Sequence, residues 1–270
     1  MKKLLFLVLA TLSLISCRST PEKAEAAAEV VWEPYNETAE LVELESHENP
    51  RLRLKLLNSR FLDKNQVWAP FEEELKAFSE EDYEALKPLI LEKNIPELQG
   101  SVAEGKLSYE KLVLFYLYRI RKYESDNQKT LNAIIALNPK VVEQARQKDR
   151  QRATGTDVFS LYGMPILLKD NINTANMPTS AGAIVLAENR TDNAFIVERL
   201  MDAGALILGK VNLSEWAYYF CEGCPLGYSA VGGQTLNPYG RKIFETGGSS
   251  SGSAVAVAAT WFRSRRGRAA

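Results

Sequence analysis

Apolar positions between residues 108 and 210 follow two different spacings along the chain. The stretch SYEKLVLFYLYRIRKYE (108–124) places apolar side chains three and four residues apart, which predicts a helix with Ser108 as its N-cap. The runs MPILLKDN and ALILGK are short and almost continuously apolar, a pattern typical of strands that are buried on both faces. Strands and helices therefore alternate, which predicts an α/β fold with a parallel or mixed sheet.

Capping residues indicate where an earlier helix begins. In SEEDYEALKPLILEKN, Ser79 is followed three residues later by Asp82, which is the arrangement of a capping box. Pro88 lies inside the same stretch and predicts a break or a kink. These helical signals lie within residues 71–94.

A further strand and helix are expected in LNAIIALNPKVVEQARQKDRQRATG. A strand over residues 132–137 leads to Asn138 as a cap, to Pro139 at the first helical position, and to a helix that ends before Gly155. The stretch TDNAFIVERLMDAG predicts another helix, which starts at its Thr-Asp pair and stops at Gly204.

The overall charge is close to neutral and argues against some classes of partner. Lysine and arginine total 33 against 34 aspartate and glutamate residues, so no basic field favours nucleic acid. The arginines within 263–268 are a local exception. No G-x-x-x-x-G-K-[ST] motif is present, so we expect no bound nucleotide and no other cofactor.

The first residues have the composition of a secretion signal. Lys2 and Lys3 precede LLFLVLATLSLI, an apolar stretch that is short for a bilayer span and that ends in LISC. LISC resembles the bacterial lipobox, so residues 1–16 are expected to be a lipoprotein signal peptide and Cys17 to carry the lipid. The protein would then be anchored to a membrane of the bacterial cell envelope. An ordinary secretory signal with an incidental cysteine is the alternative.

Residues 17–70 are expected to form a tether and an N-terminal extension. Residues 18–50 are rich in Glu, Ala, Ser, Thr and Pro and show little periodicity, which is typical of a flexible tether. The one histidine, His47, lies at the far end of this stretch, and no set of zinc ligands is present, so no metal is expected. Cys221 and Cys224 of the CEGC sequence are interpreted as incidental loop residues, with a redox or disulfide pair as the alternative.

The serine cluster in TGGSSSGSAVAVA is the strongest candidate for chemistry. Residues 248–252 match the G-x-S-x-G nucleophile elbow, but that class needs a histidine after the serine, and no histidine follows His47. Lysine is an alternative base, and it must be neutral to act as one. Lys169 ends the apolar run PILLK and would emerge from a buried strand end into a loop. A lysine that simply leaves the core at a strand end is the alternative interpretation.

Four segments in a fixed order resemble one enzyme family. GMPILLKDNINT, AGALILGKVNLSEWA, GGQTLNPY and GGSSSGSAVAVAA together resemble the amidase signature family, and in particular its peptide-amidase-like branch. The resemblance extends from about Leu107 to Ala259. It implies an α/β/α layered domain with a mixed central sheet. It also implies a hydrolase of carboxamides, acting on a small amide or a peptide amide without metal or nucleotide.

The resemblance also assigns roles to individual residues. The family uses a Ser-cisSer-Lys triad, in which Lys169 matches the base and Ser249 matches the bridging serine, held by a cis peptide bond. Ser250 would support this pair through hydrogen bonding, and Gly247 and Gly248 would permit the backbone geometry. The lysine draws a proton through the bridging serine from a third serine, which attacks the amide carbonyl and forms an acyl-enzyme.

The sequence departs from the family pattern after Ala259. The family's third serine follows a Gly-rich loop about two dozen residues after the bridging serine, a position that falls just beyond Ala270. TWFRSRRGRAA stands in place of that loop, and Ser264 lacks its glycine context. We therefore expect a partial amidase signature domain with N-terminal helices over 71–259 and an aberrant basic tail over 260–270. The chain would be truncated before its nucleophile and inactive, through a frameshift or a sequencing error, with a genuine short variant as the alternative.

Two other functions stay open on the sequence. A non-catalytic envelope lipoprotein would use the amidase scaffold for binding. An amidotransferase A subunit would produce ammonia for a partner, but the lipobox argues against that role because tRNA-linked chemistry is cytosolic.

Overall fold

A mixed three-stranded sheet lies at the centre of the fold. The structure, a computed structural model, describes residues 31–152, 157 and 159–261. The strands are β1 (Ile134–Leu137), β2 (Pro165–Lys169) and β3 (Leu206–Val211), followed by β4 (Tyr228–Ser229) and β5 (Gly233–Gln234). β3 is central, with β1 antiparallel on one side and β2 parallel on the other, and β4 and β5 form a separate antiparallel pair.

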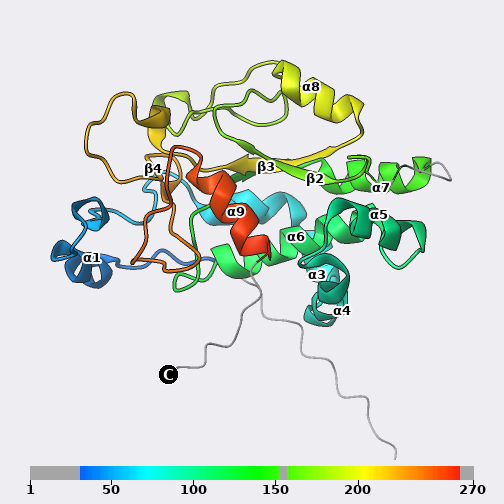
Figure 1. The fold of residues 1–270 in the computed structure, drawn as a ribbon, viewed down its shortest axis with the longest axis horizontal. Helices are drawn as coiled ribbons and strands as arrows, with labels where there is room; N and C mark the ends of the chain where they lie inside the picture. Colours follow the sequence, from blue (N-terminus) through cyan, green and yellow to red (C-terminus); the bar gives the residue numbers. More distant parts are fainter. Residues whose placement is uncertain (1–30, 153–156, 158, 262–270) are drawn as a thin grey trace, which may run out of the picture.

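Helices cover both faces of the three-stranded sheet (Figure 1). The α-helices are α1 (Thr38–Glu45), α2 (Lys64–Trp68), α3 (Glu72–Ala77), α4 (Glu80–Ile90), α5 (Ile95–Ala103), α6 (Tyr109–Glu124), α7 (Val141–Gln151), α8 (Phe195–Asp202) and α9 (Ser251–Trp261). Short 3₁₀ helices are η1 (Pro50–Leu52), η2 (Ala69–Phe71), η3 (Ile184–Leu186) and η4 (Glu215–Tyr218).

Alternate residues of β3 enter two separate cores. Ile207 packs with Leu168 and with Val197 of α8 on one face. Leu206 lies on the other face, in the larger core beneath α6 and α9. This alternation follows from the two-residue repeat of a strand. The α/β class with a mixed central sheet is confirmed.

Two of the expected N-caps are present in the structure. The Ser79 hydroxyl accepts a hydrogen bond from the Asp82 N–H, the Ser79 N–H donates to the Asp82 carboxylate, and this capping box opens α4. Ser108 accepts from the Lys111 N–H and opens α6. α4 continues through Pro88 and ends at Ile90, so the break expected at Pro88 is not observed.

Two helices begin later than the sequence predicts. α7 begins at Val141 instead of Pro139, because the Asn138 side chain is tied to the carbonyl of Ile207 in β3 (2.9 Å) as well as to the Lys140 N–H. α8 begins at Phe195, because the preceding Ala194 is extended and its N–H donates to the Asn173 carbonyl (3.0 Å). In both cases a contact distant in sequence outweighs the local start signal.

The expectation that both apolar runs are buried on both faces is correct for one strand only. Every residue of β3 is buried, whereas in β2 only Leu168 is buried and the other residues are half-buried. β2 lies at the edge of this sheet in the described part of the chain, so one of its sides has no neighbouring strand there.

The part of the expected tether that the structure describes is folded. Residues 31–50 include α1, and the side chains of Trp32 and Leu44 are buried in two different cores. The Trp32 indole N–H also donates to the Asn127 side chain (2.8 Å). A few large apolar side chains in a polar stretch therefore anchor it to the body of the protein. The rest of this stretch, with Cys17, lies outside the described residues.

No helix within residues 31–152 and 159–261 is long and apolar enough to cross a membrane. The apolar stretch that ends before Cys17 and residues 262–270 of the expected basic tail lie outside the described residues. Residues 260 and 261 of that tail belong to α9.

Candidate active site

Lys169 is the last residue of β2 and stands at the carboxyl end of the sheet. It lies beside Val211, the last residue of β3. The chain turns directly afterwards, where the Ile172 N–H donates to the Lys169 carbonyl (2.9 Å). The carboxyl end of a sheet is where α/β folds commonly place their functional groups.

The serine cluster lies at the start of α9, after a tight turn. Gly247 and Gly248 both have positive φ, 66° and 55°, a conformation that side-chain-bearing residues rarely adopt. This turn directs Ser249 and Ser250 toward the end of β2. Two glycines before the serines are therefore needed for backbone conformation.

Lys169 and the serines meet although about 80 residues separate them in the sequence. The Lys169 ammonium lies 2.8 Å from the Ser249 hydroxyl oxygen and 3.1 Å from that of Ser250. Burial lowers the pKa of Lys169, because a desolvated site disfavours the charged amine. The arrangement brings a lysine with increased neutral character into hydrogen-bond contact with two hydroxyls, so it can exchange protons with them.

The backbone beyond β3 holds the serine segment in place. The Gly252 N–H donates to the Asn212 carbonyl (3.1 Å), and the Ser214 N–H donates to the Ser249 carbonyl (3.2 Å). A Cβ on Gly252 would lie 2.2 Å from the Asn212 carbonyl oxygen, so this approach requires glycine. β3 and the residues directly after it thus position both Lys169 and Ser249.

Asn212 is a functional-site support that sequence reasoning missed. Its buried side chain donates to the carbonyls of Asn132 (3.1 Å) and Gly233 (3.0 Å), and it accepts from the Ser229 hydroxyl (2.6 Å). These bonds connect the end of β3 to the β4–β5 pair. A polar residue directly after a buried strand was the available signal.

Asp170 and Lys210 form a buried ion pair next to Lys169, and this pair was also missed. Their charged atoms lie 3.1 Å apart, and the side chains are 2% and 0% exposed. Burial lowers the pKa of Lys210, and the Asp170 carboxylate opposes that shift. The lysine inside the apolar run ALILGK was the signal, because a lysine is rarely buried without a partner.

The expected cis peptide bond at Ser249 is absent. All peptide bonds in the described residues are trans. A cis bond before a residue other than proline costs about 3 kcal/mol and needs surroundings that enforce it. Here Gly247 and Gly248 have positive φ, and Ser249 reaches Lys169 with trans bonds.

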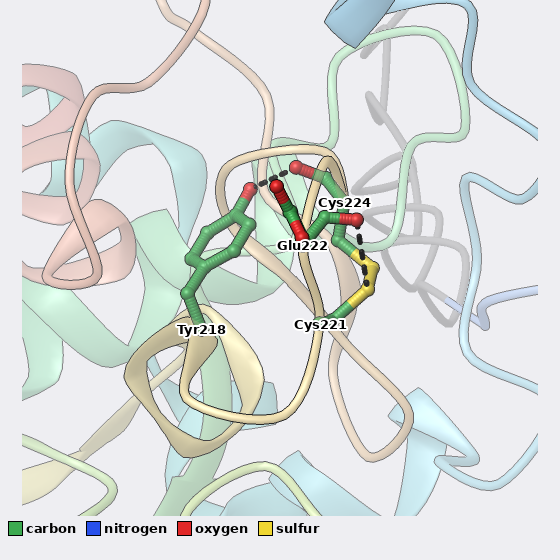
Figure 2. The surroundings of a disulfide bond; sticks show 4 residues. All are labelled: Tyr218, Cys221, Glu222 and Cys224. Carbon is green, nitrogen blue, oxygen red and sulfur yellow. Dashed lines mark hydrogen bonds between the residues drawn. A yellow bond between two sulfur atoms is a disulfide. The ribbon is translucent and has the colours of Figure 1, made fainter.

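Cys221 and Cys224 are joined by a disulfide, so the interpretation of incidental cysteines is wrong. Figure 2 shows the pair at the tip of a loop, where the Tyr218 hydroxyl donates to the Cys224 carbonyl. The loop begins with three residues of positive φ, Trp216, Ala217 and Tyr218. A three-residue separation places the two Cα atoms 5.7 Å apart, within the usual range for a disulfide.

No group of three or more His, Cys, Asp or Glu residues in the described ranges is arranged to hold a metal ion. Among the same residues, no other serine hydroxyl forms a hydrogen bond with the Ser249 hydroxyl.

Comparison with known proteins identifies similar sequences for this part of the chain. The family model Amidase matches residues 111–263, which is more than half of the chain. The "Probable amidase At4g34880" of Arabidopsis thaliana is 39% identical over 174 residues, which are 63% of this chain and 33% of the relative. A subunits of glutamyl-tRNA(Gln) amidotransferases also match. The chain spans about a third or less of the length of these curated relatives.

Solved structures agree in fold. An amidase family protein from Bacillus anthracis str. Ames has a TM-score of 0.69 and 43% identity, covering 75% of this chain and 40% of that protein. The native peptide amidase from Stenotrophomonas maltophilia has a TM-score of 0.58 and 47% identity, covering 62% of this chain and 34% of that protein.

Proposed function

The chain belongs to the amidase family, and on this premise we propose that Lys169 and Ser249 form the proton relay of a hydrolase that cleaves carboxamide C–N bonds. The observation that carries the proposal is the 2.8 Å contact between the Lys169 amine and the Ser249 hydroxyl. The lowered pKa of Lys169 supports it, because only a neutral amine can accept a proton.

The relay moves one net proton toward Lys169 when the new C–O bond forms, and one net proton away from Lys169 when the C–N bond breaks. Neutral Lys169 takes the proton of the Ser249 hydroxyl while Ser249 takes the proton of an attacking serine. The attacking oxygen bonds to the amide carbon, and the protonated lysine then returns its proton through Ser249 to the leaving nitrogen. Water repeats the sequence on the acyl-enzyme and releases the acid.

Ser250 has a supporting role in this scheme. Its hydroxyl lies 3.1 Å from the Lys169 amine, so it can hold the amine on the side of Ser249 when the amine is neutral. Gly247 and Gly248 supply the turn that brings both hydroxyls to the lysine. No described serine contacts the Ser249 hydroxyl, so we propose that the described residues contain the relay without the attacking serine. We also propose that the 270-residue chain is inactive by itself.

The substrate class and the location are part of the same proposal. The 47% identity to a peptide amidase favours a peptide amide or a small linear amide as substrate. The LISC sequence at Cys17 favours a lipid-anchored protein on the bacterial envelope. An envelope location argues against the amidotransferase role.

Ammonia release from an amidated peptide tests the proposal in two proteins. The purified chain is expected to release none. A chimera of the Stenotrophomonas maltophilia peptide amidase, with residues 107–259 in place of the matching segment, is expected to release ammonia and to lose this activity with Lys169→Ala or Ser249→Ala. Activity that survives Lys169→Ala would overturn the relay. Lys169-dependent turnover by the 270-residue chain would overturn the proposal that this chain lacks the attacking serine. Glutamine, tested in parallel, distinguishes an amidotransferase-like activity.

A further inference from the structure

We propose that the buried Asp170–Lys210 ion pair is a positioning device for Lys169, which fixes the strand end that carries Lys169 and cancels the charge of the neighbouring carboxylate. The inference rests on the proposed role of Lys169 as a base. The pair itself touches neither Ser249 nor Ser250 in any hydrogen bond of the described residues, so it acts through Lys169.

Successive residues at the end of β2 point to opposite faces. Lys169 points toward the serines of α9, and Asp170 points into the interior, where its carboxylate meets Lys210. The backbone of Asp170 is fixed as well, because its N–H donates to the Val211 carbonyl (3.2 Å) and its carbonyl accepts from the Ala181 N–H (3.1 Å). Residue 170 is therefore held by both its backbone and its side chain, and this fixes the direction in which Lys169 leaves the sheet.

Every hydrogen-bonding group of the ion pair is used. The three ammonium protons of Lys210 are matched by the Asp170 carboxylate (3.1 Å), the Thr179 hydroxyl (2.9 Å) and the Pro178 carbonyl (3.2 Å). The second Asp170 oxygen accepts from the N–H (3.1 Å) and from the hydroxyl of Ser180. Full satisfaction of this kind permits two charges to stay buried.

A register shift in the sheet brings Lys210 to Asp170. Ile166 pairs with Ile207, but the next residue, Leu167, pairs with Gly209. After this shift Lys210 lies beside Leu168, on the face that contains the α8 core. Such irregularities re-aim side chains and are common near functional sites. A pair that served stability alone could be apolar, because buried ion pairs commonly contribute no more than apolar residues of similar volume.

The charge of Asp170 matters because it is next to Lys169. A carboxylate without a partner would favour the protonated form of a nearby lysine, whereas a carboxylate paired with Lys210 has a much weaker field. In the described residues, the lowered pKa of Lys169 has burial as its cause and no contribution from a charged neighbour. α9 has no ionisable side chain, the serine segment contributes only hydroxyls, and the Glu215 carboxylate is engaged by the Ala230 N–H (2.8 Å).

Trace acetylation of the full chain over a range of pH, read by mass spectrometry, measures the pKa of Lys169 directly. Lys210→Met leaves the carboxylate unpaired and is expected to raise the pKa of Lys169 by about one unit. Asp170→Asn leaves the Lys210 ammonium unpaired and is expected to lower the pKa of Lys169. The double variant is expected to return the pKa of Lys169 to the wild-type value. Lys64→Met breaks the buried Lys64–Glu124 pair (3.6 Å), and among the described residues Lys64 forms no hydrogen bond with Lys169, Ser249 or Ser250. It is the matched control and is expected to leave the pKa of Lys169 unchanged.

Opposite shifts in the two single variants are a signature that loss of stability alone does not produce. Equal shifts in both, no shift in either, or a comparable shift in Lys64→Met would overturn the proposal. If Lys210→Met does not fold, Asp170→Asn and the double variant still decide between the outcomes. A wild-type Lys169 with an ordinary lysine pKa would instead contradict the proposed base, so the two failures are distinguishable.

Discussion

Gly252→Ala is predicted to separate the serine segment from Lys169, because Gly252 lies where α9 meets the end of β3. The new Cβ would lie 2.2 Å from the Asn212 carbonyl oxygen and 2.6 Å from its nitrogen. Ordinary contacts begin at 3.4 Å, and backbone atoms cannot rotate away as a flexible side chain can. The start of α9 must therefore move by more than about 1 Å, and Ser249 moves with it.

The magnitude follows from three terms. Overpacking costs about 1–3 kcal/mol, and loss of the Gly252 N–H bond to Asn212 (3.1 Å) costs about 1 kcal/mol. The better helix propensity of alanine returns up to about 1 kcal/mol. The net loss of stability is about 1–3 kcal/mol by these same terms.

Urea unfolding of the full chain measures this loss, with Gly100→Ala as the control. Gly100 lies inside α5, and a Cβ there would meet nothing within 4 Å, so alanine should stabilise it by about 0.5–1 kcal/mol. Trace acetylation then reports on the site, because a displaced Ser249 leaves the Lys169 amine without its closest hydroxyl. Equal unfolding free energies for the two variants would refute the close approach. A destabilised Gly252→Ala with unchanged Lys169 reactivity would refute the link from α9 to the lysine.

Three further predictions test separate parts of the molecule. Lys169→Met should raise the melting temperature at pH 7, because the lowered folded-state pKa of Lys169 means that the protonated lysine opposes folding. The difference in melting temperature between variant and wild type should vanish as the pH rises past about 10.4, the pKa of an unfolded lysine. A difference in melting temperature that grows with pH would contradict a lowered pKa. Arg241→Ala should cost about 1–3 kcal/mol in urea unfolding, because its guanidinium donates to the Thr130 and Asn127 carbonyls and to Glu40, and a loss near zero would show that the N-terminal segment is not held there. Cys17→Ala should abolish incorporation of radiolabelled fatty acid in a bacterial host, and continued labelling would exclude the LISC cysteine as the lipid site.

Some of the site was visible in the sequence because chemistry and order along the chain were enough. The run PILLK placed Lys169 at a strand end, and the glycine-serine segment placed Ser249 before a helix. The resemblance to amidases indicated that these two belong together. The prediction of a cis peptide bond was wrong. Two glycines in the left-handed conformation bring Ser249 to Lys169 with trans bonds, and the family pattern does not contain this information.

Other parts depended on contacts that local pattern does not contain. Residues 31–50 have the composition of a tether, yet Trp32 and Leu44 bury their side chains in two cores. The spacing of Cys221 and Cys224 was compatible with a disulfide and with two incidental cysteines, and in the folded loop the two residues form the disulfide. α7 begins after the expected position because the Asn138 side chain donates a hydrogen bond to the Ile207 carbonyl of β3.

The sequence by itself determined the three strands of the central sheet, the caps of α4 and α6, and the two residues that meet in the candidate site. Hydrophobic spacing and capping chemistry act over a few residues, so they can be recognised locally. Only the tertiary structure decided that Lys210 neutralises Asp170, that Asn212 supports the serine segment and that β2 lies at the edge of the sheet formed by the described residues. These features depend on strand order, on a register shift and on backbone approaches between distant segments, and packing across the whole domain sets all three.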